Sequence, residues 1–249
     1  MAFNSQLFIK AKQIFNNSTK TIYYCQDFES GFFPYSAEYV EAAKAIAGTQ
    51  NIIVSTELLR KFLVNRQLLS NQRIYTTSPK IEPFDVPQEK TKRLFFYFRP
   101  ESFHRRNLPE TLMEAVQDFC NKHTGYEIYM VGSVDTRLSY KINNTPVYVI
   151  SKLPKKEYLQ LISSSDVVIS MIYSAHPGVI AFQAAASGIP TVTNVFENRN
   201  ALLLKQISEN ILPYDPIREN LLEVIEEALN MPKGNKSFKE ELYSDSNIQ

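Results

Sequence analysis

Residues 166–193, DVVISMIYSAHPGVIAFQAAASGIPTVT, decide the fold of this chain. The stretch predicts, in order, a buried strand, a polar loop, a helix and a second strand, at 167–172, 173–178, 179–187 and 191–193. The first strand is a run of mostly apolar, largely β-branched residues, which is typical of the core of a parallel sheet. Gly188 ends the helix because glycine tolerates the left-handed backbone conformation that closes many helices. The pattern therefore predicts an α/β protein with a parallel sheet.

The loop of this stretch is a candidate ligand site. Ser174, His176, Pro177 and Gly178 follow a predicted strand, and ligands of open parallel sheets bind beyond the carboxyl ends of the strands. A helix that begins near Gly178 would offer free N–H groups and the positive end of its dipole to a phosphate. The alternative is an ordinary strand, loop and helix of an α/β core without a ligand, and the stretch alone fits both equally well.

Composition and charge narrow the class of protein. The 249 residues suffice for one large or two smaller domains, and 44% hydrophobic residues suffice for a full core. A net charge of +1 argues against a nucleic-acid-binding protein that relies on a broad basic surface. The two cysteines, Cys25 and Cys120, form no paired motif, so we expect neither a disulfide framework nor a zinc site.

The N-terminus and the glycine pattern exclude further classes. The first ten residues, MAFNSQLFIK, lack the pattern of a signal peptide, and no apolar run approaches the ~20 residues that cross a bilayer. Neither G-x-G-x-x-G nor G-x-x-x-x-G-K-[ST] occurs, so we expect no phosphate binding through those loops. The sequence thus predicts a soluble, cytoplasmic α/β protein.

Alternating strands and helices predict two domains. In the first, a helix at 3–16 precedes strands at 21–25 and 51–55, which alternate with helices at 37–47 and 57–69. Ser36 and Thr56 are the expected caps of the last two helices. Residues 76–92 carry three prolines and no periodic pattern, which indicates a linker. We therefore predict a partial N-terminal Rossmann-like domain with its linker at 1–86 and a C-terminal Rossmann-like domain at 87–232.

The second domain begins with a predicted strand at 94–98. Further strands are expected at 128–132 and 147–150, and helices from 154, at 198–208 and at 216–230. Asn107 and Glu110 predict a capping box at the start of the first helix. The polar tail at 233–249 is expected to fray.

Three arginines lie between the strand at 94–98 and the helix that follows it. Arg99, Arg105 and Arg106 would place three guanidinium groups beside free helix N–H groups, an arrangement suited to a diphosphate. The alternative is a solvated basic loop.

Other polar residues are candidates by their position. His176 lies at a strand end, although a lone loop histidine is more often a surface or packing residue. Gln183 stands on an otherwise apolar helix face, either as a ligand-binding group or as a buried, satisfied amide. Asp27 and Glu29 follow the first strand and are a candidate polar pair, although we favour their interpretation as surface turn carboxylates.

These pieces occur in an order that resembles a known family. They are YYCQDFE at 23–29 with FFP at 32–34, FRP at 98–100 followed by RN at 106–107, SAHP at 174–177, ASGIP at 186–190 and TNVFEN at 193–198. Together they resemble glycosyltransferases of the GT-B fold, in particular family 4 and, more narrowly, WsaF-like rhamnosyltransferases. The resemblance covers about residues 3–230.

The resemblance implies a nucleoside-diphosphate sugar as substrate, held by the C-terminal domain. Arg99 and one of Arg105 or Arg106 would grip the diphosphate, and the loop at 174–178 with the helix behind it would hold the sugar and ribose. No metal and no cofactor are implied, and the catalytic residue is not identified. The expected reaction transfers a deoxyhexose such as rhamnose to a surface polysaccharide, in the cytoplasm or at the inner face of the membrane with peripheral membrane association.

The chain departs from the family in two respects. Family 4 usually has two glutamates eight positions apart, where this chain has Ala175 and Gln183; WsaF-like members lack the first glutamate but keep the second. An amide could still bond a ribose hydroxyl, without charge. We also expect the chain to start midway through the first of two Rossmann-like domains.

The second departure leaves rival interpretations open. The chain could be a non-catalytic nucleotide-sugar-binding module, or a half-enzyme that needs a partner chain. An exposed sheet edge would then favour self-association or a partner. An unrelated Rossmann-like enzyme is a weaker rival, because the glycine fingerprint is absent.

Overall fold

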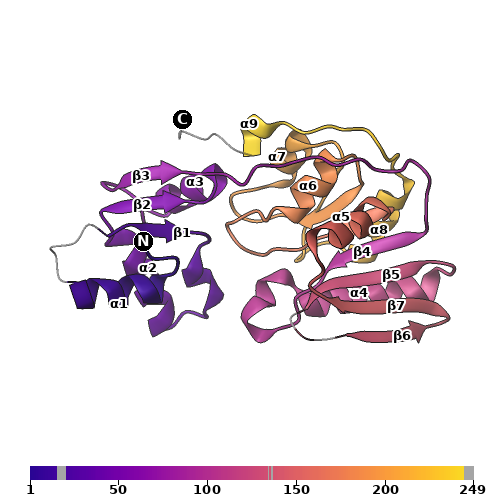
Figure 1. The fold of residues 1–249 in the computed structure, drawn as a ribbon, viewed down its shortest axis with the longest axis horizontal. Helices are drawn as coiled ribbons and strands as arrows, with labels where there is room; N and C mark the ends of the chain where they lie inside the picture. Colours follow the sequence, from indigo (N-terminus) through magenta and orange to yellow (C-terminus); the bar gives the residue numbers. More distant parts are fainter. Residues whose placement is uncertain (16–20, 134, 136, 244–249) are drawn as a thin grey trace.

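Two α/β lobes, joined by an extended segment, make up the chain (Figure 1). The computed structural model describes residues 1–15, 21–133, 135 and 137–243. The joining segment follows β3 and leads into β4, so it contains all three prolines of the predicted linker.

The N-terminal lobe contains a parallel sheet of three strands in the order β1-β2-β3. Its elements are α1 (Ser5–Phe15), β1 (Tyr23–Cys25), the 3-10 helix η2 (Glu29–Phe32), α2 (Ala37–Ala47), β2 (Asn51–Val54), α3 (Glu57–Asn65) and β3 (Arg73–Thr76). The two predicted caps are confirmed, because the side chains of Ser36 and Thr56 accept hydrogen bonds from the backbone N–H groups of Tyr39 and Leu59. The short edge strand β3 escapes prediction because two of its four side chains, those of Arg73 and Tyr75, are exposed and the strand forms no apolar run.

The C-terminal lobe contains a seven-stranded sheet in the order β10-β9-β8-β4-β5-β7-β6, parallel except for the pair β6 and β7. The strands are β4 (Arg93–Tyr97), β5 (Glu127–Ser133), β6 (Leu138–Ile142), β7 (Thr145–Ser151), β8 (Val167–Ile169), β9 (Thr191–Asn194) and β10 (Ile211–Tyr214). The helices are η3 (Ser102–Asn107), α4 (Pro109–Lys122), α5 (Lys155–Ser163), α6 (Ile180–Ala186), α7 (Ala201–Ile207), α8 (Leu221–Asn230) and α9 (Glu240–Tyr243).

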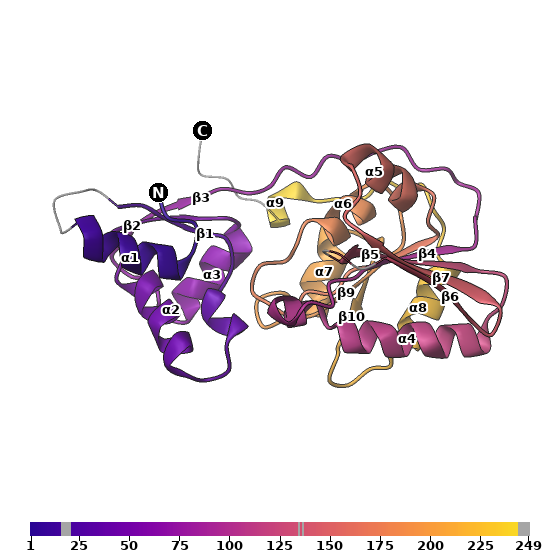
Figure 2. The same cartoon turned by 60° about the horizontal axis from the view of Figure 1, so that its bottom comes forward.

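Helices cover both faces of this larger sheet. Figure 2 shows α4 and α8 on one face and α5 and α6 on the other. The apolar side chains of β4 and β8 therefore pack on two sides, which is why these strands read as unbroken apolar runs. The predicted strands of this lobe are confirmed, although β8 ends three residues earlier than the apolar run.

The predicted capping box at Asn107 is wrong. Asn107 is buried, and its side-chain amide donates to the carbonyl of Met171, 2.8 Å away, beyond the end of β8. The helix begins instead at Pro109, after Leu108 in the left-handed conformation. A side chain that can cap a helix locally is used here for a tertiary contact, because the buried carbonyl also needs a donor.

The linker is ordered against the C-terminal lobe. The N–H of Phe84 donates to Ser187 Oγ at 3.0 Å, and the N–H groups of Thr91 and Lys92 donate to the buried carboxylate of Asp166 at 2.9 and 2.7 Å. Figure 1 shows the linker crossing the upper side of this lobe, near the C-terminal segment.

The expectation of a frayed tail is wrong for residues 233–243. The ring of Tyr243 is buried, with its centroid 4.8 Å from that of Phe182, and the N–H of Lys239 donates to Ile207. The composition of the tail is polar, but two aromatic side chains, Phe238 and Tyr243, suffice to bind it to the lobe. Residues 244–249 lie outside the described residues.

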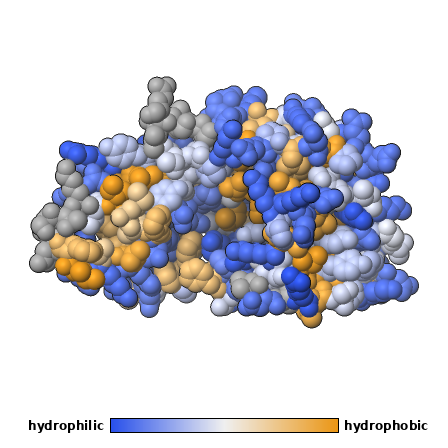
Figure 3. Space-filling view, viewed as in Figure 1, coloured by the Kyte–Doolittle hydropathy of each residue, from blue (hydrophilic) through white to orange (hydrophobic). Residues whose placement is uncertain are grey.

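The N-terminal lobe carries apolar side chains on its surface. In Figure 3 orange residues gather at the lower left, over α1, while the C-terminal lobe is mostly blue. Leu7 and Ile14 of α1 are 46% and 72% exposed. A second chain could cover such a face, so the expected self-association or partner remains a prediction.

Gly188 supports the close approach of the tail to α6. Its φ is +91°, and an added Cβ would lie 2.8–2.9 Å from backbone atoms of Gly234. Gly125 has a similar φ of +76°, but an added Cβ there would meet only the end of the Lys92 side chain, at 3.7 Å.

We therefore predict that Gly188→Ala destabilises the protein more than Gly125→Ala. The left-handed backbone costs an L-residue about 1–2 kcal/mol at either position, and overpacking against backbone adds about 1–3 kcal/mol at Gly188 alone. Urea unfolding of both variants checks this. Equal losses would show that the tail does not pack against α6 in solution.

Candidate functional site

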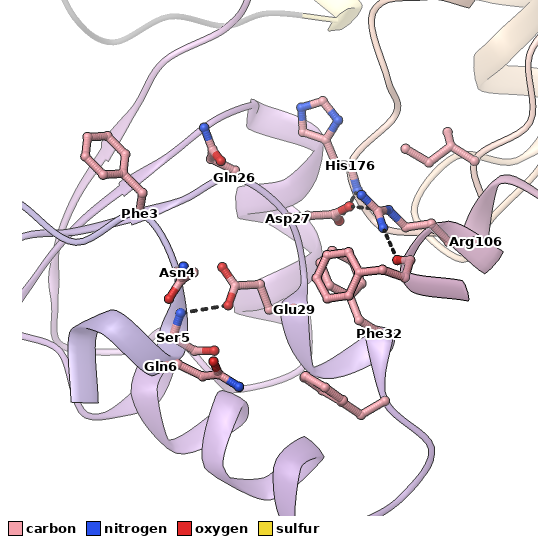
Figure 4. Close-up of a pocket in the computed structure, with 13 residues that line it drawn as sticks. Phe3, Asn4, Ser5, Gln6, Gln26, Asp27, Glu29, Phe32, Arg106 and His176 are labelled. Atoms are coloured by element: carbon pink, nitrogen blue, oxygen red, sulfur yellow. Dashed lines mark hydrogen bonds and ion pairs between the residues drawn. The ribbon is translucent and has the colours of Figure 1, made fainter. Parts of the chain in front are cut away.

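A cavity of about 410 Å³ lies between the two lobes. The N-terminal lobe contributes residues at the start of α1 and just beyond β1, and the C-terminal lobe contributes residues of η3 and of the loop after β8 (Figure 4). The cavity thus lies where the carboxyl ends of strands from both parallel sheets face each other, which is where ligands of such sheets bind.

Asp27 joins the two lobes at this cavity. Its Oδ1 accepts hydrogen bonds from Ser174 Oγ, from the N–H of His176 at 3.1 Å and from the N–H of Phe28 at 2.8 Å. Its Oδ2 lies 3.6 Å from Nε of Arg106. The interpretation of Asp27 as a surface turn carboxylate is therefore wrong: the residue is only 7% exposed. The partners come from residues far away in the sequence, so no local pattern could indicate them.

Glu29 is also buried, so the same interpretation is wrong for it. Its Oε2 accepts a hydrogen bond of 2.7 Å from the N–H of Ser5, the first residue of α1. A carboxylate at this place satisfies a free helix N–H group and faces the positive end of the helix dipole. Glu29 therefore fixes the helix start that forms one wall of the cavity.

Arg106 brings a positive charge into the cavity. Its guanidinium carbon lies 4.2 Å from the ring centroid of Phe32, and its Nη1 donates to the carbonyl of Phe103 at 3.3 Å. Burial lowers the pKa of Arg106, and the charge of Asp27 partly opposes this effect. Among the described residues, Nε of Arg106 has no hydrogen-bond partner. Nε is shielded from solvent, but the side chain as a whole is 21% exposed, so its outer N–H groups can donate to an anionic ligand.

The other two predicted arginines differ in their surroundings. Nε of Arg99 donates to Glu101 at 3.2 Å, and burial with the charges of Arg99 and Arg106 lowers the pKa of His104. Arg105 is exposed and pairs with Glu110 at 2.6 Å. Arg99 thus lies in the same basic region as Arg106, whereas Arg105 fits the solvated-loop alternative.

The loop between β8 and α6 is held in one conformation. Pro177 is buried, and Gly178 has a φ of +75°. Nδ1 of His176 accepts a hydrogen bond of 3.0 Å from the N–H of Gly178, so the ring is neutral with its proton on Nε2. Helix α6 begins at Ile180, one residue later than the sequence predicted. A phosphate at this helix start stays a prediction.

Arg199 supports the same loop from behind and was not among the predicted site residues. It is fully buried, and its guanidinium donates to the carbonyls of Ile172, of Ser174 at 2.7 Å and of His176 at 3.3 Å. Burial lowers its pKa to about 10. An arginine in a polar loop reads as exposed, so the sequence offered no signal for this role.

The two positions that differ from the family glutamates have structural roles. Ala175 is fully buried in the apolar core of the N-terminal lobe, beside Phe28 and Phe62. The Gln183 side-chain amide donates to the linker carbonyl of Glu82 at 3.1 Å. A ribose contact by Gln183 would have to share that amide, and this contact stays a prediction.

The buried neutral state of His176 predicts a pH effect on stability. Burial lowers its pKa below 6.5, so as the pH falls the unfolded chain takes up the proton first and stability is lost. We expect the parent to lose more stability than His176→Gln between pH 7 and 5, by up to about 1.4 kcal/mol per pH unit. Urea unfolding across this range measures the difference. Parallel pH curves for the two proteins would contradict the assignment.

The chain matches one protein family and resembles several solved structures. The family described as WsaF, C-terminal domain, matches residues 92–226, more than half of the chain. Sucrose-phosphate synthase from Thermosynechococcus elongatus is similar with a TM-score of 0.62 at 14% identity, covering 90% of this chain and 62% of that one. No curated protein matches at a significant level.

Two further solved structures are similar. S. aureus TarM, in complex with fondaparinux, alpha-GlcNAc-glycerol and UDP, gives a TM-score of 0.62 at 13% identity, covering 89% of this chain and 46% of that one. A solved structure described as trehalose-6-phosphate from E. coli bound with UDP-2-fluoro glucose gives a TM-score of 0.60 at 14% identity. The match covers 90% of this chain and 64% of that one. At such identities the likeness shows the fold, which is of the GT-B type as the sequence resemblance implied. The chain spans less than two thirds of the length of each of these three structures.

Two other features are absent from the described residues. Within residues 1–15, 21–133, 135 and 137–243, no helix has the length and apolar character needed to span a bilayer. The same residues contain no group of three or more histidine, cysteine, aspartate or glutamate side chains placed to hold a metal ion.

Proposed function

Because the chain belongs to the WsaF C-terminal domain family, we propose that it binds a nucleoside-diphosphate sugar and takes part in glycosyl transfer. The donor would be a deoxyhexose such as rhamnose, and the acceptor a surface polysaccharide. The observation that carries this proposal is the cavity between the lobes, with Arg106 inside it at the carboxyl ends of parallel strands.

The chemistry of the leaving group supports this assignment. In glycosyl transfer the bond from the anomeric carbon to the diphosphate breaks, and an acceptor hydroxyl oxygen bonds to that carbon and loses its proton. Negative charge therefore develops on the diphosphate, and a fixed cation in a partly buried cavity stabilises it. Arg106 would supply this charge, with Arg99 nearby, and the N–H groups at the start of α6 would add dipolar stabilisation.

The residues around Arg106 would hold it ready for such a ligand. Asp27 lies 3.6 Å from the buried Nε, too far for a strong hydrogen bond, so the outer N–H groups of the guanidinium would be the donors to a diphosphate. Ser174 and the backbone of His176 already satisfy Oδ1 of Asp27, and the carboxylate would remain paired when the ligand binds.

One observation favours a second candidate function, a nucleotide-sugar-binding module without catalysis. Gln183 stands where WsaF-like members keep a glutamate, and its amide bonds the linker carbonyl of Glu82, so this position offers no carboxylate. In such a module, binding would persist and transfer would be absent.

Arg106→Gln should weaken nucleotide binding, and Arg105→Gln serves as the matched control. Hydrogen bonds to charged groups contribute about 1.5–3 kcal/mol, so we expect UDP, dTDP or GDP to bind about ten- to a hundredfold more weakly to Arg106→Gln. Arg105 points to solvent beside Glu110 and its replacement should leave affinity unchanged. Isothermal titration measures both.

Two results of this titration would count against the proposal. One is that none of the three nucleotides binds to the folded parent. The other is that both variants bind like the parent, after circular dichroism has shown that both are folded.

The substitution Gln183→Leu tests whether Gln183 contacts the ribose of the nucleotide or only the linker. Loss of the bond to Glu82 should lower the free energy of unfolding by about 0.5–1.5 kcal/mol in either case. A ribose contact predicts an additional loss of nucleotide affinity of the same size, measured by titration, and Gln183→Glu should retain affinity. Unchanged affinity in a destabilised Gln183→Leu would make Gln183 a linker-binding residue only.

A further inference from the structure

Strand β6 forms one edge of the seven-stranded sheet. Figure 1 shows it at the lower rim of the C-terminal lobe. Within the described residues, β6 pairs only with β7, in an antiparallel register that places Leu138 opposite Val149 and Ile142 opposite Thr145. The other side of β6 therefore presents backbone N–H and C=O groups that can pair with a further strand.

The two edges of this sheet differ in how well they are protected. Proteins often protect an edge with a proline, a β-bulge or several charges. The opposite edge strand, β10, contains Pro213, whereas β6 (LSYKI) has no proline, no shift in its register with β7 and a single charge, on Lys141. Alternate residues of a strand lie on one face, and on the α4 face of β6 Tyr140 and Ile142 pack against the core while Leu138 is 57% exposed. This edge thus has the composition of a strand that is paired on both sides.

The turn between β6 and β7 determines which backbone groups point away from β7. Its two residues, 143–144, have φ angles of +46° and +68°, as a two-residue hairpin turn requires. Such a turn is closed by a hydrogen bond between its flanking residues, here Ile142 and Thr145. Hydrogen-bonded and non-hydrogen-bonded pairs alternate along an antiparallel ladder. Ser139 and Lys141 therefore direct their backbone groups outward.

These outward groups match a second copy of the same strand. In an antiparallel pair that overlaps all of β6, Tyr140 lies opposite Tyr140 of the second copy, on a two-fold axis. Ser139 then lies opposite Lys141 of the second copy, and the outward backbone groups of these two residues form the hydrogen-bonded pairs. On the α4 face, the exposed Leu138 lies opposite Ile142, so the second copy covers it with an apolar side chain.

The charged residue of β6 favours this register over a shifted one. A shift by two residues would place Lys141 opposite Lys141 of the second copy, which is unfavourable. In the proposed register Lys141 lies opposite the small Ser139, whose neighbour on β7 is Tyr148. The ring of Tyr148 is half-buried and stacks on that of Tyr129, with 5.0 Å between the centroids. The long side chain of Lys141 can extend across Ser139 to this ring and make a cation–π contact.

We propose that two copies of the chain pair through β6, which joins their seven-stranded sheets into one. The occupant is a second copy because the strand supplies every partner in its own sequence: an apolar residue for Leu138, outward backbone groups for each other, and a serine for the lysine. Two five-residue strands bury less than the ~1,200–2,000 Å² of a stable interface, so we expect the dimer to dissociate at low concentration. No residue of β6 lines the cavity between the lobes, and the inference does not depend on the proposed function.

Analytical ultracentrifugation over a range of protein concentrations tests the dimer. Ser139→Pro removes an outward N–H group, and Leu138→Lys replaces the exposed apolar residue with a charge. Each change acts twice in a symmetric dimer, so we expect the dissociation constant to rise at least about tenfold. Leu202→Lys is the matched control, because Leu202 is 68% exposed on α7, and it should dimerise like the parent. Circular dichroism shows whether each variant is folded.

Cross-linking through a new cysteine tests the register. Tyr140→Cys would place two thiols opposite each other in a non-hydrogen-bonded pair, where Cα atoms are about 4.5 Å apart, within the about 4.4–6.8 Å that a disulfide spans. Ser139→Cys is the control, because Ser139 lies opposite Lys141 rather than itself. We expect mild oxidation to link Tyr140→Cys into dimers and to leave Ser139→Cys monomeric. The native Cys25 and Cys120 are buried and should not react.

Three results would overturn the proposal. One is a parent that stays monomeric at every concentration. Another is dimerisation that Ser139→Pro and Leu138→Lys leave unchanged but Leu7→Lys abolishes, which would assign the contact to the exposed apolar face of α1. The third is a disulfide that forms as readily in Ser139→Cys as in Tyr140→Cys, which would exclude this register.

Discussion

The shape of the cavity depends on the contacts that the buried carboxylate of Asp27 makes with both lobes. A buried charge is tolerated only when hydrogen bonds and opposite charges compensate its loss of water. Asp27 meets this requirement with donors from both lobes, including Ser174, which is 147 residues away in the sequence. The positions of His176 and Arg106 follow from the same requirement, because each supplies one of the remaining partners. The cavity therefore has its shape only when both lobes are folded and in contact.

Further hydrogen bonds and an ion pair also connect the two lobes. The side-chain amide of Asn198, which follows β9, donates to Leu58 in the N-terminal lobe at 3.0 Å and to Ala175 at 2.9 Å. Arg66 and Glu197 pair across the same boundary. The loops after β8 and β9 thus belong structurally to both lobes. The affinity of a ligand that contacts these loops would therefore depend on the relative position of the two sheets. A two-lobed protein can couple donor and acceptor binding in this way.

Local patterns in the sequence were sufficient for most of the fold but for only part of the site. The strands and helices of residues 166–193, and the caps at Ser36 and Thr56, depend on near neighbours and could be predicted. Asn107 could not, because a distant carbonyl competes for its side chain. The burial of Asp27 was also hidden, since its partners come from residues far away in the sequence. Arg106 was predicted as one of three arginines, yet only tertiary contacts show that it, and not Arg105, lines the cavity.

The central claim is that the cavity between Asp27 and Arg106 is the nucleotide site. A crystal structure of the full chain soaked with UDP, dTDP or GDP tests it most directly. We predict that the diphosphate lies in this cavity with its oxygens within hydrogen-bond distance of the Arg106 guanidinium, and that Asp27 keeps its bonds to Ser174 and His176. A nucleotide bound elsewhere on the protein, with this cavity unoccupied, would contradict the account.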